Sequence, residues 1–230
     1  PESLLDDRGR RIMWAWVLDR RSEDEIRQVG WSGMMTLPRV LSLDDNGLLR
    51  IEPVQELESL RSNHRRLENI TVTKGSELVL DRISGDSLEL SLTMTPQEAR
   101  DFGLKVRCSP NGEEQTVITC DLEKKCLRID MSKSSLDQRV TYRTCCMYGG
   151  ENPVVTCQEA PFELNSDETL NLRIFIDHCL LEVFANSRQC LTQPIYPTRE
   201  DSQRIVLYSR DGDMLANTVD AWTMIPSNPW

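Results

Sequence analysis

Apolar and polar residues alternate along much of the chain, which is the pattern of half-buried β-strands. The clearest case is SLELSLTM (87–94), where Leu88, Leu90 and Leu92 fall on one side of an extended strand. Apolar runs of strand length return about every 8–12 residues with turn-forming residues between them, which predicts a β-sandwich or barrel. Beyond residue 69 the predicted strands are 77–83, 87–94, 103–108, 115–121, 126–131, 140–146, 170–177, 179–186, 188–197, 204–210 and 216–224.

The first 54 residues contain shorter strand-like runs. RRIMWAWVL (10–18) is apolar and aromatic, and MMTLP, VLSL and LLRIEP follow it further along. The DNG tripeptide (45–47) predicts a tight turn, because Asn and Gly tolerate positive φ. The charged stretch DRRSEDEIRQ (19–28) is predicted to be a loop. Residues 10–54 should therefore form three or four short antiparallel strands, a unit that resembles one β-propeller blade. The sequence has no internal repeat, so it does not encode a complete propeller.

The segment PVQELESLRSNHRRLE (53–68) has a different periodicity. Val54, Leu57 and Leu60 stand at helical spacing, and Pro53 suits a first helical turn, where its missing N–H does no harm. This is the one convincing helix pattern in the sequence. We therefore expect three parts: a blade over 1–54, a helical linker over 55–69 and a β-sandwich over 70–230.

One predicted hairpin, RIFIDHCLLEVFAN (173–186), has a register that the sequence itself selects. With a two-residue turn at His178 and Cys179, a one-sided apolar face results, whereas a slip by one residue would set Ile176 opposite Glu182. His-Cys is nevertheless poor chemistry for such a turn. The predicted apolar face consists of Ile174, Ile176, Leu181, Val183 and Ala185.

The same register places Asp177 and Glu182 as diagonal neighbours on the opposite face, roughly 7 Å apart. Glycosidases use two carboxylates at separations of this order, one as acid and one as nucleophile or base. The alternative is the polar face of a hairpin, at the surface or packed against a neighbouring domain. We favour the alternative, because no other chemistry converges on the pair and a hairpin face is not a pocket.

The charge balance narrows the classes of partner. The chain has 27 basic and 37 acidic residues, a formal net charge of -10. This balance disfavours nucleic-acid phosphate and anionic lipid as partners and suits a neutral ligand such as a sugar. No apolar run reaches the roughly 20 residues that span a bilayer. We therefore predict neither a nucleic-acid nor a membrane partner.

The cysteines do not predict a metal site. They form no C-x-x-C pair and the chain has only two histidines, whereas structural zinc needs about four closely spaced ligands. We expect no metal and no cofactor. Disulfides and buried free thiols both remain open, and with them the cellular compartment. The eight cysteines are Cys108, Cys120, Cys126, Cys145, Cys146, Cys157, Cys179 and Cys190.

Three segments together resemble glycoside hydrolase family 32, the invertases, levanases and inulinases. GRRIMWAWVLDRR (9–21) with GWSGMMTLPRVLSL (30–43) is similar to the last propeller blade of that family, and RIEPVQELESLR (50–61) to the linker after it. LRIFIDHCLLEVFANSRQCLTQPIYP (172–197) is similar to the signature of the C-terminal sandwich. The resemblance implies an all-β chain in which the last blade of a five-bladed propeller and a short helical linker precede a C-terminal β-sandwich.

The resemblance also implies an activity, the retaining hydrolysis of β-fructosides such as sucrose, levan or inulin. In the family, an Asp nucleophile, a Glu general acid and a further Asp that stabilises the transition state lie in W-M-N-D-P-N-G, R-D-P and E-C motifs. This sequence contains no N-D-P, R-D-P or E-C, so it carries no catalytic residue over from the family. The chain starts at Pro1 without an initiator Met or a signal peptide, and we expect it to be an inactive, structural C-terminal fragment. Its blade should be covered by the missing propeller or by a second copy.

The resemblance implies one substrate contact. The last blade of the family places an aromatic residue near the fructose pocket, and Trp16 is the better match, with Trp14 the lesser. An indole ring can stack on a sugar while its N–H bonds a hydroxyl. Alternatively, both residues pack inside the blade, and their spacing of two puts them on one face of a strand.

Two other functions remain open, a carbohydrate-binding sandwich and a module that serves assembly alone. The candidate aromatics for sugar binding are Trp222 and Trp230.

Overall fold

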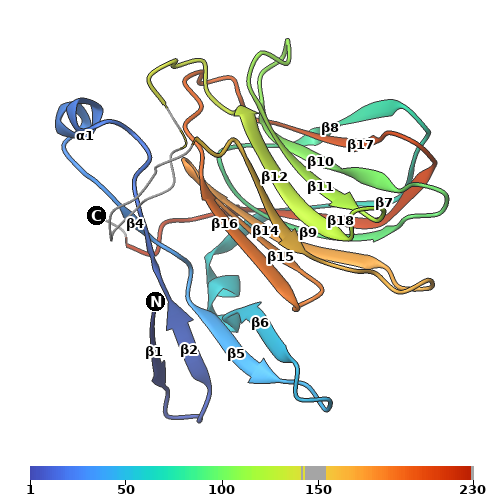
Figure 1. Ribbon diagram of the computed structural model, residues 1–230, viewed down its shortest axis with the longest axis horizontal. Helices are drawn as coiled ribbons and strands as arrows, with labels where there is room; N and C mark the ends of the chain where they lie inside the picture. Colours follow the sequence, from blue (N-terminus) through green and yellow to red (C-terminus); the bar gives the residue numbers. More distant parts are fainter. Residues whose placement is uncertain (141, 143–153, 229–230) are drawn as a thin grey trace.

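The computed structural model describes residues 1–140, 142 and 154–228. Two six-stranded antiparallel sheets pack face to face as a β-sandwich (Figure 1). The first sheet runs in the order β13 (Cys157–Pro161), β12 (Cys126–Lys133), β11 (Gln115–Asp121), β10 (Asp101–Cys108), β17 (Arg204–Ser209) and β8 (Ser76–Ser84). The second, which we call the blade-side sheet, runs β16 (Gln189–Pro194), β15 (Leu180–Ala185), β14 (Leu170–Asp177), β9 (Ser87–Thr95), β18 (Met214–Met224) and β7 (Arg61–Val72).

The core of the sandwich is formed by the apolar faces of these strands. Leu88, Leu90 and Leu92 are all buried, as the alternation in β9 predicts. They face Phe102 and Ile118 of the opposite sheet in one continuous apolar cluster. The period of two places alternate side chains inside, and this burial is what stabilises the sandwich.

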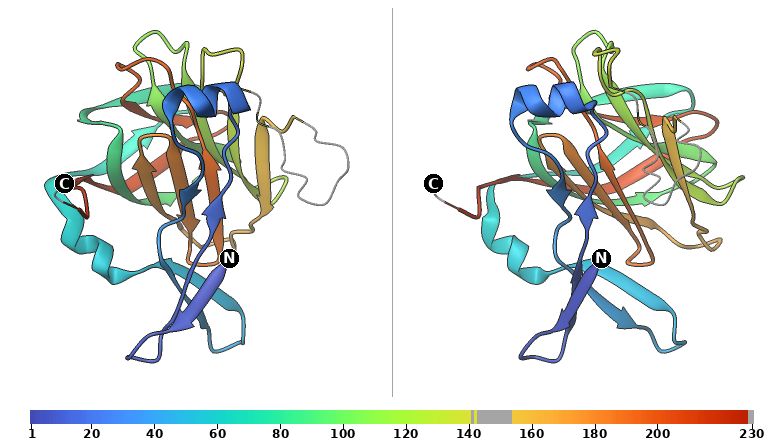
Figure 2. Two further views of the ribbon diagram at one scale, coloured as in Figure 1. Left: turned by 90° about the vertical axis from the view of Figure 1, so that its left-hand side faces the viewer. Right: turned by 60° about the vertical axis from the view of Figure 1, so that its left-hand side comes forward.

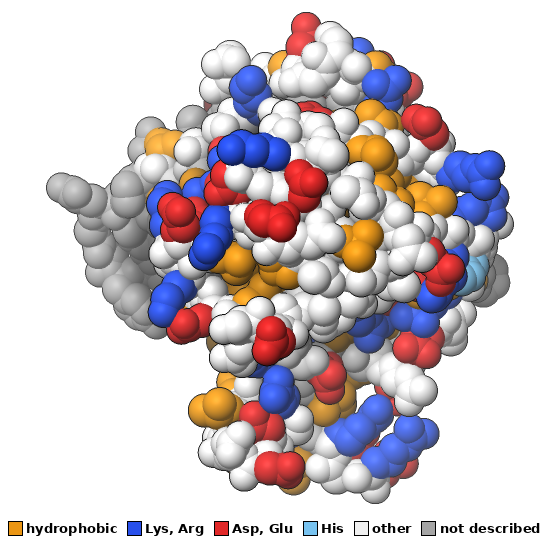
Figure 3. Space-filling view, turned by 90° about the vertical axis from the view of Figure 1, so that its right-hand side faces the viewer, with side chains coloured by type: hydrophobic (Ala, Val, Ile, Leu, Met, Phe, Trp, Pro, Cys, Tyr) orange, Lys and Arg blue, Asp and Glu red, His pale blue; other side chains and the backbone are white. Residues whose placement is uncertain are grey.

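A separate four-stranded sheet, which we call the blade, projects beneath the sandwich (Figures 2 and 3). Its order is β1 (Glu2–Leu5), β2 (Arg11–Trp14), β5 (Arg39–Leu43) and β6 (Leu49–Pro53). The predicted turn closes β5 onto β6, with Gly47 at φ 76° and two backbone N–H groups bonded to the Asp44 carboxylate. A two-stranded sheet, β3 (Trp16–Val17) with β4 (Met34–Met35), continues from the blade.

The stretch predicted to be a loop, 19–28, is in fact largely helical. Helix α1 spans Glu23–Val29. The Ser22 side chain accepts the N–H of Glu25, and the Glu25 carboxylate accepts the N–H of Ser22, which is a complete capping box. Gly30 ends the helix at φ 79°. The loop prediction was wrong because the charge of the stretch hid these capping signals.

The linker helix is shorter than predicted. Its helical part is a 3-10 turn, η1 (Gln55–Leu60), and the chain then enters β7 at Arg61. Pro53 is not in the helix but ends β6. The helix prediction fails beyond Leu60 because β7 pairs with β18 along most of its length, and this pairing outweighs the local helical spacing.

The hairpin of β14 and β15 has the predicted register. Asp177 pairs with Leu180 and Ile176 with Leu181 across a two-residue turn, and the predicted apolar face is buried. His178 takes the positive φ that such a turn requires, 49°. Burial of one face therefore selects this register in spite of the poor turn residue.

The remaining strand predictions agree with the structure to within a few residues at most ends. β1, β7 and β13 were not predicted. The strand predicted over 140–146 lies outside the described residues apart from Val140 and Tyr142, neither of which is in a strand.

Candidate functional site

Trp16, the first candidate for a sugar contact, lies on the two-stranded sheet and is 65% exposed. It pairs with Met35 across β3 and β4. Its indole packs against Gly33, where φ is 76° and an added Cβ would collide with the indole Nε1. The ring therefore rests on backbone and leaves area free for a ligand.

Trp14, the second candidate, has different surroundings. It is half-buried and packs against the apolar cluster between the blade and the sandwich. We call this contact region the junction. The expectation that Trp14 and Trp16 share one face is not met, because β2 ends at Trp14 and the chain changes pairing partner at Ala15. The buried residues of the junction are Ile12, Val54, Leu57, Phe175 and Phe184.

Asp177 and Glu182 do not form a paired site. Asp177 is exposed, whereas the Glu182 side chain is 1% exposed and turns into the junction. Its carboxylate accepts the N–H of Leu37 at 2.5 Å and the Thr192 hydroxyl at 3.0 Å, and it pairs with the Arg39 guanidinium. Glu182 is therefore not a surface residue. The sequence could not show this, because the blade that covers Glu182 lies far from it in the sequence.

The electrostatics of Glu182 fit a structural role. Burial raises its pKa, while the guanidinium of Arg39 and the two hydrogen bonds oppose that rise. Each carboxylate oxygen already has a protein partner. Glu182 is thus engaged across the junction and does not face a ligand.

A second buried ionic group, which no sequence pattern indicates, joins the segment after Trp16 to the sandwich. The Asp19 carboxylate pairs with Arg21 at 2.6 Å and accepts the Tyr196 hydroxyl at 3.0 Å. Burial opposes ionisation of Asp19, but the hydrogen bonds from Arg21 and Tyr196 outweigh it and lower its pKa. The Arg21 guanidinium also lies 4.2 Å from the ring centroid of Trp31.

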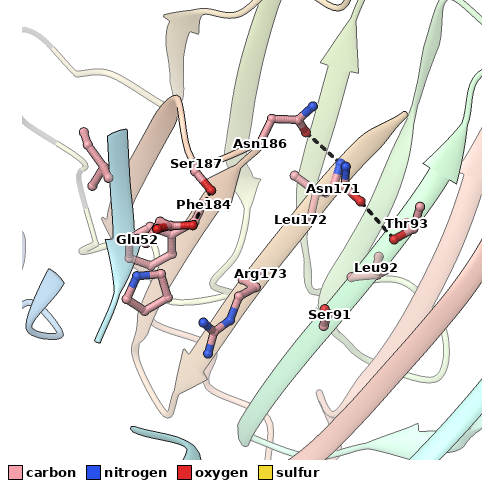
Figure 4. A pocket seen from close by; sticks show the side chains of 12 residues that line it. Glu52, Ser91, Leu92, Thr93, Asn171, Leu172, Arg173, Phe184, Asn186 and Ser187 are labelled. Atoms are coloured by element: carbon pink, nitrogen blue, oxygen red, sulfur yellow. Dashed lines mark hydrogen bonds between the residues drawn. The ribbon is translucent and has the colours of Figure 1, made fainter. Parts of the chain in front are cut away.

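A polar groove of about 220 Å³ runs between β6 of the blade and the blade-side sheet. Figure 4 shows Glu52 and Ser187, joined by a 2.8 Å hydrogen bond, on one side, with Asn171 and Thr93 across from them, also bonded to each other. Arg173 lies between the two sides. The Arg173 guanidinium is bonded to the buried Glu89 carboxylate at 2.6 Å and 2.9 Å. The hydroxyl and amide groups of the groove are therefore the ones suited to hydrogen-bonding a sugar.

The other aromatic candidates, Trp222 and Trp230, provide less support for a sugar contact. Trp222 stacks on His64 with ring centroids 4.8 Å apart, and the Arg61 guanidinium lies 4.0 Å from its ring. Protein groups therefore already occupy ring surface that a sugar would need. Trp230 lies outside the described residues.

The thiols do not form a reactive site in the described part of the chain. The six cysteines described there are all free, and burial raises the pKa of both Cys108 and Cys120 to about 12. Cys145 and Cys146 lie outside the described residues. Among residues 1–140, 142 and 154–228, His, Cys, Asp and Glu form no group of three suited to a metal ion. In the same residues, no helix has the length and apolarity to cross a membrane.

Comparison with known proteins gives a consistent match along the chain. Residues 56–223 match the family model "Glycosyl hydrolases family 32 C terminal", and residues 1–53 match "Glycosyl hydrolases family 32 N-terminal domain". The levanase of Bacillus subtilis (strain 168) is 30% identical over 89% of this chain and 29% of its own length. Fructan 6-exohydrolase of Beta vulgaris is 24% identical over 97% of this chain and 41% of its own length. The chain thus spans less than half of these relatives.

Solved structures share the fold. Fructan 1-exohydrolase IIa from Cichorium intybus matches with a TM-score of 0.81 and 22% identity, over 97% of this chain and 47% of that one. Exo-inulinase from Aspergillus awamori matches with a TM-score of 0.72 and 19% identity, over 94% of this chain and 40% of that one. The Cichorium enzyme has also been solved in complex with 1-kestose.

Proposed function

Because the chain belongs to glycosyl hydrolase family 32, we propose that residues 1–230 form the supporting, non-catalytic part of an enzyme that hydrolyses β-fructosides such as sucrose, levan or inulin. The observation that carries this proposal is the junction, where a single blade is docked on the sandwich through a buried ion pair and an apolar cluster. The chain has none of the three motifs that hold the catalytic carboxylates in the family. Alone, it should be inactive.

We propose that the two structural parts of the chain correspond to separate sheets. Residues 1–54 supply the blade and the residues beyond the linker supply the sandwich. The linker is short, because β7 already pairs within the blade-side sheet from Arg61 onwards. The interlocked junction makes the two parts a single support for the pocket.

Trp16 is the residue that we propose meets the substrate, and Trp14 is the weaker candidate. An exposed indole on the blade can stack on the apolar face of a fructosyl ring. Trp14 is engaged in junction packing, which leaves less of its ring for a ligand.

The blade has exposed apolar side chains that call for a cover. We propose that further propeller blades, or a second copy of this chain, lie over them in the functional protein. Sedimentation over a range of concentrations distinguishes the two. A homodimer of the chain supports the second copy. A monomer that forms a complex with an added propeller domain of the family supports the missing blades. The exposed residues are Leu4, Leu5, Leu43, Leu48 and Leu49.

The experiment for the main proposal measures fructose release by the purified chain. With sucrose, levan and inulin as substrates, the chain should release none, while a complete family enzyme assayed in parallel should release fructose. A chimera in which residues 1–230 replace the matching part of the Bacillus subtilis levanase should be active. In that chimera Trp16→Ala should lower kcat/KM and Trp222→Ala should not. Fructose release by the isolated chain would refute the proposal.

The polar groove favours a second function, carbohydrate binding without catalysis. Groups on both of its sides are hydrogen-bond donors and acceptors, and its volume of about 220 Å³ suits a single sugar ring. Calorimetric titration with inulin and levan tests this function, with Asn171→Ala as the groove variant and Asn46→Ala as an exposed control. Binding that Asn171→Ala abolishes supports it, and the absence of heat at millimolar sugar excludes it.

A further inference from the structure

The strand that carries Trp16 is too short to hold itself in place. β3 has two residues and, among the described strands, pairs only with the two residues of β4. An isolated two-stranded pair is marginal in water even when it is longer. A side chain that stacks on substrate needs to be held to within a fraction of an ångström, so the constraint on Trp16 has to come from elsewhere.

The first constraint runs from the sandwich through Glu182. The N–H of Ala15, directly before Trp16, donates to the Thr36 hydroxyl at 2.9 Å, and the N–H of Thr36 donates back to the Ala15 carbonyl at 2.9 Å. The next residue, Leu37, donates its N–H to the Glu182 carboxylate. Two hydrogen-bonded steps therefore join a buried carboxylate of β15 to the backbone beside Trp16.

The second constraint lies on the other side of Trp16. The N–H of Arg20 donates to the Tyr196 hydroxyl at 3.0 Å, and that hydroxyl donates to the Asp19 carboxylate at 3.0 Å. Tyr196 is buried and belongs to the core cluster of the sandwich. The segment 15–20 is therefore held at both ends by the sandwich, through hydrogen bonds between residues 145 and 176 positions apart in the sequence.

We infer that Glu182 and Tyr196 are positioning residues, through which the sandwich fixes the short strand that presents Trp16 to a fructosyl substrate. Only the last step, the contact between Trp16 and a saccharide, rests on the proposed function. The clamp itself rests on the hydrogen bonds just described. The sandwich then does more than stabilise the blade, because it sets the position of one wall of the substrate pocket.

Amide hydrogen exchange of the 230-residue chain tests the clamp without any substrate. One variant is Tyr196→Phe, which removes only the hydroxyl. The other is the double substitution Arg39→Met with Glu182→Met, which removes both charges together and so leaves no unpaired buried ion. Exchange in residues 14–20 should accelerate roughly tenfold in each, the factor that corresponds to about 1.4 kcal/mol. Exchange in β17 should not change.

Matched controls separate positioning from a general loss of stability. Tyr208→Phe removes another buried hydroxyl, which bonds Thr119. The triple substitution of Arg61, Glu89 and Arg173 by Met removes together the charges of another ion cluster of the blade-side sheet, in which Glu89 holds both arginines. Neither control group touches residues 14–20. Unchanged exchange over 14–20 in the clamp variants, or equal acceleration in the controls, would overturn the inference.

The two proposals fail in different ways. If exchange accelerates as expected but Trp16→Ala leaves the kcat/KM of the levanase chimera intact, the clamp stands and the substrate contact is refuted. If Trp16→Ala lowers kcat/KM but the clamp variants leave exchange unchanged, the contact stands and the positioning role is refuted.

Discussion

The guanidinium of Arg39 in the blade pairs with the carboxylate of Glu182 in the sandwich, 143 residues further along the chain. Both side chains are almost fully buried, at 7% and 1% exposure. The apolar junction residues surround them, so water cannot solvate either charge if its partner is removed. The pair is the ionic centre of the contact between the two parts of the molecule.

The first prediction concerns this pair. Glu182→Met should lower the free energy of unfolding by about 3–5 kcal/mol, because it leaves Arg39 charged, buried and unpaired. Adding Arg39→Met to it should restore most of the loss, since two methionines can fill the same volume without charge. Urea unfolding of the single and double variants provides the measurement. A double variant as unstable as the single one would show that packing, not the unpaired charge, sets the cost.

The second prediction concerns acid stability and Glu114. Its buried carboxylate accepts five hydrogen bonds, from Leu136, Thr198, Arg199 and Ser202. Burial acts to raise its pKa, but these bonds outweigh it and hold the pKa below the usual value. The stability that ionised Glu114 contributes is therefore complete above the unfolded-state pKa of about 4.3 and is lost as the pH falls through the folded-state pKa.

Glu114→Gln should accordingly destabilise the chain at neutral pH, and the difference from wild type should shrink as the pH falls below about 4. Unfolding free energies measured across that pH range give the comparison. The exposed Glu123→Gln is the control and should follow the wild-type curve. A difference between Glu114→Gln and wild type that is independent of pH would contradict the assigned role.

The third prediction concerns Arg107, a buried guanidinium whose Nε and Nη1 have no hydrogen-bond partner among the described residues. The nearest carboxylate contact is Asp86 at 3.7 Å, and burial lowers the pKa of Arg107. Because an unsatisfied buried donor costs about 1–3 kcal/mol, Arg107→Met should leave stability unchanged or raise it. Arg128→Met is the matched control, since Arg128 bonds Asp101 at 2.8 Å, and it should destabilise. Thermal unfolding compares the stability of the two variants. A larger loss of stability in Arg107→Met than in Arg128→Met would contradict the prediction.

The fourth prediction concerns the turn of the β14–β15 hairpin. His178 has φ 49°, a conformation that costs residues other than Gly, Asn and Asp about 1–2 kcal/mol. His178→Gly should therefore raise the free energy of unfolding by up to about 1 kcal/mol. Cys179→Gly, at the neighbouring position without positive φ, should lower it. Chemical unfolding of both variants decides, and a destabilised His178→Gly would mean that the bond between His178 and Asp86 outweighs the backbone strain.

The sandwich was predictable because its signal is local and repeated. Leu88, Leu90 and Leu92 alternate with polar residues, and any fold that buries one face of such a strand buries these three. The same argument selected the hairpin register at His178. Helix α1 was also within reach, since Ser22, Glu25 and Gly30 are the residues of a capping box and a C-cap.

The sequence by itself determined most strands of the sandwich, the inward face of those with clear alternation and the three segments that match one enzyme family. Only the tertiary structure decided that Glu182 is buried while Asp177 is exposed, and that Trp14 packs inward while Trp16 faces outward. The physical reason is that strand periodicity tells which residues share a face but not what covers that face. The blade covers Glu182 and supplies Arg39 from 143 residues away, and no local pattern specifies that docking.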